Sequence, residues 1–187
     1  MKRLILLTLA LLLVSSTAIA QPPVGYIGLF IDESHTTSCV TGVGFYPVEM
    51  WIWCLPSYAG QICAEFMIAY PPNVIQSTTT PNTAIISVTL GDLPSGMSVC
   101  YISCQWDWHW PFHQLLYVTD PTPTEVNIVK HPDPSILCVQ FANCEPGYPT
   151  ECATVYTKLL INQECPPEDP ISTEKVSWGA IKGLYKR

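Results

Sequence analysis

The sequence predicts an all-β protein: a single antiparallel β-sandwich of about nine strands, with an N-terminal signal helix and a short C-terminal tail. Three observations support this fold class. β-Branched and aromatic residues are plentiful, 18 prolines interrupt the chain, and no long segment carries the apolar stripe of an amphipathic helix. An up-and-down barrel fits less well, because the spacing between the expected strands is uneven.

Residues 1–20 have the pattern of a secretory signal peptide. A basic start precedes an apolar run from Leu4 to Val14, which is too short to span a bilayer, and small residues lie at the expected cleavage site after Ala20. An uncleaved membrane anchor is the alternative, and Gln21 at the new N-terminus argues against a lipoprotein. We therefore expect a secreted protein (periplasmic, cell-surface or extracellular). No later segment has the length and apolarity of a membrane span.

The expected strands alternate in polarity and are separated by proline-rich turns. In Pro47–Leu55, Val48 and every second residue up to Cys54 share one side, while Glu49 and two tryptophans share the other. Residues 62–70 repeat this period of two, which is typical of a half-buried strand. The full set of expected strands is 24–32, 47–55, 62–70, 84–90, 97–103, 114–119, 124–130, 136–142 and 153–161.

Charge divides the mature chain into an acidic body and a basic end. We expect the sandwich domain at 21–165, followed by a proline-rich linker and basic tail at 166–187. Between residues 21 and 170, Lys130 and Lys158 are the only basic residues, against fourteen acids. Such a body does not attract phosphate backbones, which excludes nucleic acid as a partner. For the tail, a role in sorting or surface attachment and a disordered terminus remain alternatives.

Nine cysteines in an exported chain predict disulfide bonds, up to four of them. The odd number leaves one thiol free, buried or shared with another molecule, and the spacings do not match a zinc framework. On a straight strand, Cys100 and Cys104 would lie about 13 Å apart, so they should pair with different partners. Cys144 and Cys152 bracket a turn-rich loop and are our expected pair. The other partners are left open for Cys39, Cys54, Cys63, Cys100, Cys104, Cys138 and Cys165.

The segment 106–113 (WDWHWPFH) holds the candidate ligand-binding residues. If it is extended, Trp106, Trp108 and Trp110 share one face. A row of tryptophans can stack on sugar rings, and Asp107 could accept hydrogen bonds from the sugar. The alternative is that the indoles pack into the protein.

The same segment also suggests a metal site, although we expect none and no cofactor. His109 and His113 are four residues apart and are the weak candidate ligands, with Asp107 and His131 as additions. Pro111 argues against the helix that this spacing would need. We identify no catalytic residues, because the sequence lacks a nucleophile elbow, a P-loop and a dinucleotide-binding glycine pattern.

Residues Ala64–Ile75 carry a resemblance to a known family. AEFMIAYPPNVI resembles the cohesin signature in which a strand ends in Tyr-Asp-Pro-x-Val-Leu, with Tyr70, Pro72, Val74 and Ile75 in the matching places. Pro71 replaces the usual Asp. The resemblance implies an immunoglobulin-like β-sandwich, and cohesins bind dockerin modules.

We therefore expect an exported, non-catalytic binding or structural protein, at the cell surface or in an extracellular assembly. Its partner would be another protein or a glycan, and a second copy of the chain is a further candidate. A carbohydrate-binding module that uses the tryptophan row is the first alternative. A metal-binding protein or a hydrolytic enzyme is the second.

Overall fold

A computed structural model describes residues 23–44 and 46–165. The expected signal helix and cleavage site, and the whole 166–187 linker and tail, lie outside these residues, as does Phe45. Within the described ranges the chain forms thirteen strands and no helix, which confirms the all-β prediction. No helix capable of crossing a membrane is found among the described residues.

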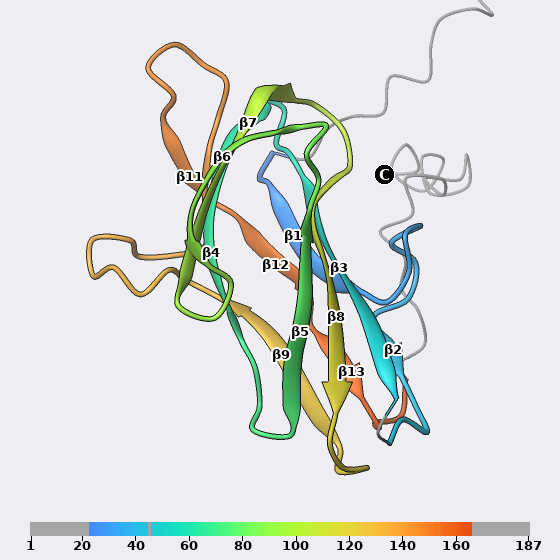
Figure 1. Ribbon diagram of the computed structural model, residues 1–187. Helices are drawn as coiled ribbons and strands as arrows, with labels where there is room; N and C mark the ends of the chain where they lie inside the picture. The colour runs from blue at the N-terminus through green and yellow to red at the C-terminus, as the bar shows by residue number, and fades with distance from the viewer. Residues whose placement is uncertain (1–22, 45, 166–187) are drawn as a thin grey trace, which may run out of the picture. The chain divides into compact units, whose positions relative to one another are not determined.

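The strands form two sheets (Figure 1). The first sheet has the order β12-β1-β3-β8-β5. The second has the order β11-β10-β4-β9-β13-β2. In addition, β7 pairs with β4, and β6 pairs with β7. The bounds are β1 Tyr26–Phe30, β2 Cys39–Val40, β3 Pro47–Leu55, β4 Gln61–Ala69, β5 Val74–Pro81, β6 Ile86–Asp92, β7 Gly96–Gln105, β8 His109–Val118, β9 Thr124–Val129, β10 Gln140–Ala142, β11 Thr150–Cys152, β12 Thr154–Thr157 and β13 Leu159–Ile161. Two pairings, β1 with β12 and β2 with β13, are parallel; the other pairings are antiparallel.

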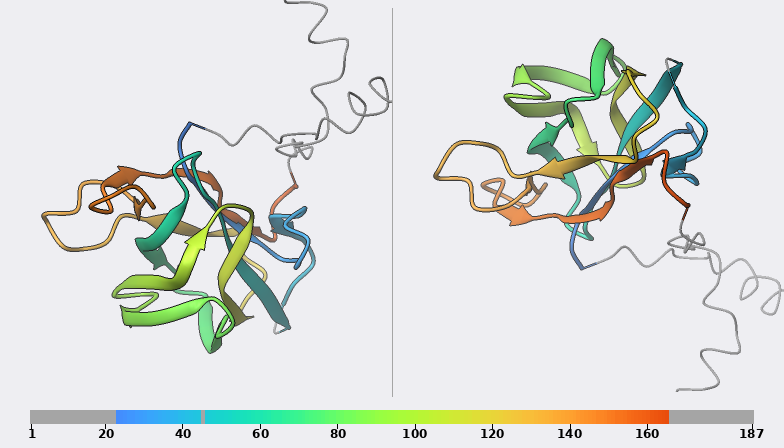
Figure 2. Two further views of the ribbon diagram at one scale, coloured as in Figure 1. Left: turned by 90° about the horizontal axis from the view of Figure 1, so that it is seen from above. Right: turned by 90° about the horizontal axis from the view of Figure 1, so that it is seen from below.

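The hydrophobic core lies between the two sheets. In β3, Met50 and Ile52 are fully buried, while Glu49 is exposed on the other side, as the alternation predicts. In β4, Phe66 fills the same layer from the second sheet. Each such side chain contributes about 1.5–3 kcal/mol through burial. The views along the strands show the loop between β9 and β10 projecting away from this core (Figure 2).

Several strand boundaries differ from those expected. β5 was missed because it is an edge strand whose residues 77–81 are exposed, so it lacks an apolar alternation. The expected strand 136–142 shrinks to 140–142, since the preceding residues form the projecting loop. The expected strand 153–161 is two strands: β12 pairs with β1 in the first sheet and β13 pairs with β9 in the second.

Four disulfides join the described residues: Cys39–Cys165, Cys63–Cys100, Cys104–Cys144 and Cys138–Cys152. The predicted Cys144–Cys152 pair is therefore wrong. In the β10–β11 hairpin Cys152 lies opposite Gln140, which places it beside Cys138. Cys144 lies beyond the hairpin, where its N–H donates to the carbonyl of Ala59, near the end of β7 that carries Cys104. The prediction that Cys100 and Cys104 have different partners is confirmed.

The ninth cysteine, Cys54, is a free thiol buried in the core. Burial raises the pKa of this thiol to about 12, despite hydrogen bonding with Tyr101 and Gln61. The thiol therefore stays protonated and inaccessible. This corrects the idea that the odd cysteine links the chain to another molecule.

Candidate functional site

A bulge in β8 decides where the candidate residues point. Phe112 pairs with Ile52, but His109 pairs with Cys54, so three steps along β8 match two steps along β3. The extra residue reverses the alternation of β8 between these pairs. His109 consequently faces the core with Cys54, whereas His113 lies on the outer face beside Trp51. The two candidate metal ligands are thus on opposite faces of the sheet.

His109 is buried and uncharged. Its Nδ1 lies 3.0 Å from the carbonyl oxygen of Asp107, and its ring meets Tyr101 edge-on with centroids 4.8 Å apart. Burial lowers the pKa of His109 to about 4, and the neighbouring Asp107 opposes this only weakly. Its buried Nε2 has no hydrogen-bond partner within the described part of the chain.

The outer face of the first sheet carries an unusual number of aromatic rings. At one end, His35 stacks on Trp108 with centroids 4.5 Å apart and contacts Trp53 at 4.6 Å. His35 adopts a left-handed φ of 49°, in a turn held by the Asp32 carboxylate, which accepts from the N–H groups of Thr36 and Thr37. We call the whole set the aromatic face: Tyr26, Phe30, His35, Trp51, Trp53, Trp108, Trp110, His113 and Tyr156.

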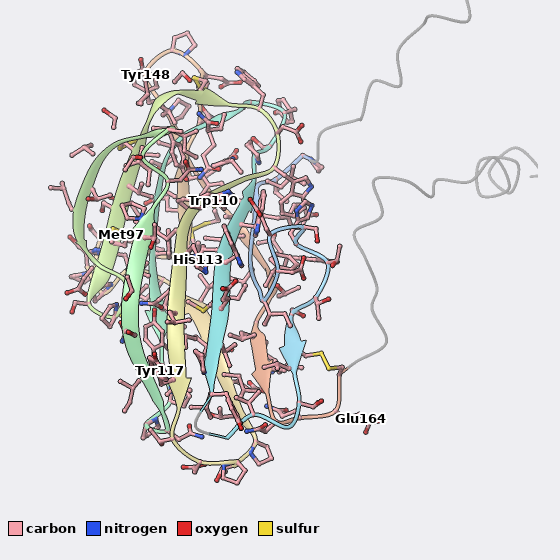
Figure 3. The ribbon with its side chains drawn as sticks, turned by 45° about the vertical axis from the view of Figure 1, so that its right-hand side comes forward. Met97, Trp110, His113, Tyr117, Tyr148 and Glu164 are labelled. Carbon is pink, nitrogen blue, oxygen red and sulfur yellow. A yellow bond between two sulfur atoms is a disulfide. The ribbon has the colours of Figure 1, made fainter. Side chains whose placement is uncertain are left out.

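The middle of the aromatic face is more open. Trp51 stacks on His113 with centroids 4.2 Å apart, and Trp110 meets Trp51 edge-on at 4.9 Å. The three side chains are half-buried, and His113 Nε2 lies 3.8 Å from the carboxylate of Glu49. Figure 3 shows Trp110 and His113 along β8, with Tyr117 further toward the end of the strand.

The structure separates the predicted tryptophan row. Trp106 lies in the loop after β7, where its ring and the Cys144 sulfur both lie so close to Gly60 that a Cβ on Gly60 would touch each of them. Trp108 and Trp110 lie in different parts of the aromatic face. Asp107, which precedes Trp108, is exposed, and its Oδ1 accepts from the N–H of Trp108. The neighbours Trp51 and Trp53 were not among the candidate residues, although the alternation of β3 had placed both on the outer side.

The outer face of the second sheet has an exposed apolar strip. In β6, Val88 is 48% exposed and Leu90 is 67% exposed. Val88 lies opposite Cys100, whose disulfide to Cys63 crosses from β7 to β4. We call Val88, Leu90 and this disulfide the apolar strip.

Ionisable side chains do not gather into an evident reaction centre in the described ranges. No group of three or more His, Cys, Asp and Glu side chains there is arranged to hold a metal ion. An open depression lined by residues 41–44, Tyr46, Pro121 and residues 162–164 contains one carboxylate, that of Glu164. The aromatic face and the apolar strip are therefore the features best suited to binding.

Comparison with known proteins identifies the fold. No family model and no curated protein matches the sequence. Solved structures match: the sixth cohesin of Acetivibrio cellulolyticus scaffoldin B, in complex with a dockerin, has a TM-score of 0.52 at 11% identity, over 75% of this chain and 99% of its own. A type II cohesin of the Acetivibrio cellulolyticus cellulosome has a TM-score of 0.52 at 14% identity, over 75% and 96%.

A third similar structure is the type III cohesin module from a cell-surface anchoring scaffoldin of Ruminococcus flavefaciens. It matches with a TM-score of 0.52 at 8% identity, over 80% of this chain and 93% of its own. At such identities the likeness concerns the fold alone, and it extends the resemblance first noted at Ala64–Ile75 to most of the chain. The protein therefore has a cohesin-like β-sandwich fold.

Proposed function

We propose that the chain is an exported, non-catalytic binding module that contacts a partner protein of an extracellular or cell-surface assembly through its apolar strip. The exposure of Val88 and Leu90 on an open sheet is the observation that carries this proposal. Exposed apolar side chains on a flat surface suit a protein partner better than a small molecule, which requires a concave site. The cohesin-like fold supports it further, since the similar scaffoldin B cohesin was solved with a dockerin.

The surroundings of the apolar strip favour a stable contact. The Cys63–Cys100 disulfide ties β4 to β7 beneath Val88, and Ser98, opposite Leu90, donates its hydroxyl to the Glu65 carboxylate at 3.0 Å. An apolar centre beside polar groups is the usual composition of a protein interface. Because the surface is already rigid, binding costs little conformational entropy. Four disulfides also fit an oxidising compartment outside the cytoplasm.

The experiment measures the native size of the chain in the exported fraction of its source cells. The Val88→Thr/Leu90→Gln variant keeps residues compatible with a strand but removes the apolar side chains. We expect the wild type to migrate in a complex and this variant to migrate as a monomer with an unchanged melting temperature. The matched control, Ile75→Thr/Tyr117→Gln, alters an exposed pair on the first sheet and should stay in the complex. A monomeric wild type, or equal losses in both variants, would contradict the proposal.

Glycan binding is a second candidate function, and the half-exposed Trp110 favours it. Trp110 lies against Trp51 and near His113, in the open part of the aromatic face. Indole rings stack on sugars, and Glu49 beside His113 could accept hydrogen bonds from hydroxyl groups. Of the four predicted ligand residues, we retain Trp110 as the central one. Trp110→Ala should abolish retention on a polysaccharide column, while Trp106→Ala should not; the reverse order would refute this site.

A further inference from the structure

Three loops meet at one end of the sandwich, at the top of Figure 1. They follow β3, β7 and β10, and each is covalently or closely joined to the next. The Cys104–Cys144 disulfide links the end of β7, just before the second loop, to the third loop. The N–H of Cys144 donates to the carbonyl of Ala59 in the first loop at 3.0 Å. The ring of Trp106 packs against Gly60. The three loops therefore form one continuous surface, which we call the loop end.

Each of these loops exposes one large aromatic side chain. Tyr58 is 65% exposed, Trp106 is 52% exposed and Tyr148 is 61% exposed; Figure 3 shows Tyr148 at this end of the molecule. The Tyr148 loop has a fixed conformation, because Tyr148 donates its N–H to the Glu145 carbonyl and Asn143 donates to Pro149. Exposed aromatic side chains on rigid loops are typical anchors of binding surfaces, since little side-chain freedom is lost on contact.

The charge at the loop end is negative. Asp107 lies next to Trp106, Glu145 lies in the Tyr148 loop, and both are exposed. The three loops contain no lysine or arginine. Lys130 and Lys158 are the only basic residues between 23 and 165; the first donates to the Ile136 carbonyl and the second pairs with Glu125. Neither lysine lies in the loops, so neither forms an ion pair with the acidic groups there.

We propose that the loop end is a second contact surface that binds an arginine- or lysine-bearing segment of a partner protein. A guanidinium or ammonium group is attracted both to the face of an aromatic ring and to a carboxylate. The loop end offers both kinds of group, with no basic residue to repel the cation. This surface is separate from the apolar strip, so it goes beyond the function proposed above.

The test uses the mature chain, from Gln21 to Arg187, and a fluorescent synthetic peptide in which arginine alternates with glycine. Binding is followed by fluorescence anisotropy at low and at high salt. We expect binding at low salt that weakens as salt screens the charges. Tyr148→Ala combined with Glu145→Gln should weaken binding by about ten-fold, which requires the loss of only a few favourable contacts. A peptide with glutamate in place of arginine should not bind.

The control variant is Tyr46→Ala combined with Glu33→Gln. Both residues are exposed and lie outside the three loops, so this variant loses one tyrosine and one charge as well. Its affinity for the arginine peptide should equal that of the wild type. Equal weakening in both variants would mean that the acidic body attracts the peptide everywhere, and it would overturn the proposal. Absence of binding at low salt would overturn it as well.

Discussion

Gln114 is a polar side chain in the core, and its contacts allow a quantitative prediction. It is almost fully buried on β8. Its Oε1 accepts from the Tyr70 hydroxyl at 2.6 Å, and its Nε2 donates to Thr79 Oγ1 at 2.8 Å. Tyr70 follows β4 and Thr79 belongs to β5, so this amide connects the second sheet to the edge strand of the first.

Replacing Gln114 by leucine keeps roughly the same volume and removes both hydrogen bonds. Each bond contributes about 1 kcal/mol, and the largely buried Tyr70 hydroxyl left without its acceptor adds about 1–3 kcal/mol, so we expect a loss of about 3–5 kcal/mol. Tyr70→Phe removes that stranded hydroxyl. The double variant loses the two bonds but strands no hydroxyl, so it should be about 2–4 kcal/mol more stable than the sum of the two single losses predicts.

Urea denaturation of the wild type, both single variants and the double variant measures this coupling. A second cycle pairs Gln114→Leu with Tyr46→Phe, an exposed tyrosine that does not contact Gln114, and should show no coupling. If the losses from Gln114→Leu and Tyr70→Phe add to within about 0.5 kcal/mol, the hydrogen bond does not stabilise the fold and the reasoning is wrong.

Gly91, Cys54 and His109 each support a further test. Gly91 has a φ of +82°, and a Cβ there would overlap the Gly96 carbonyl. Gly91→Ala should therefore lower the free energy of unfolding by about 3 kcal/mol, whereas Gly44→Ala should leave it unchanged. Equal melting temperatures of the two variants in thermal unfolding would refute this. Cys54 should give no reaction with a thiol reagent in the native chain and one thiol per chain in denaturant; reaction in the native state would contradict its burial. His109 has a pKa of about 4 in the fold against 6.5 unfolded, so the unfolded chain binds the proton more readily, and stability should fall by up to about 3 kcal/mol as pH drops from 6.5 to 4. His109→Gln should flatten this dependence in urea titrations, and an unchanged slope would assign it to other groups.

The strands could be predicted wherever polar and apolar residues alternate along the strand's own sequence. Pro47–Leu55 has the same bounds in the sequence prediction and in the structure, because one side of β3 packs into the core and the other does not. β5 escaped prediction since an edge strand rich in threonine buries little. The division of 153–161 between two sheets depends on partners far away in the sequence, which local periodicity does not reveal.

The candidate site was harder to predict, because the direction of its side chains depends on the one extra residue of the bulge in β8. Without the bulge, His109 and His113 would share a face, as their spacing indicates; the extra residue near Pro111 places one in the core and one outside. The disulfides show the same limit. Spacing alone predicted that Cys100 and Cys104 have different disulfide partners. The partners of Cys144 and Cys152 follow instead from the register of the β10–β11 hairpin, which cannot be read from the sequence.

The Cys39–Cys165 disulfide has a mechanical consequence. It joins residues 126 positions apart, near the two ends of the described domain. If the chain is stretched between its termini, tension passes from residue 38 through the sulfur atoms directly to the segment after Cys165. The residues between the two cysteines carry no load while this bond is intact, and only β1 can be peeled from its neighbours β3 and β12. A domain held at both ends would therefore extend by a short distance and then resist further extension.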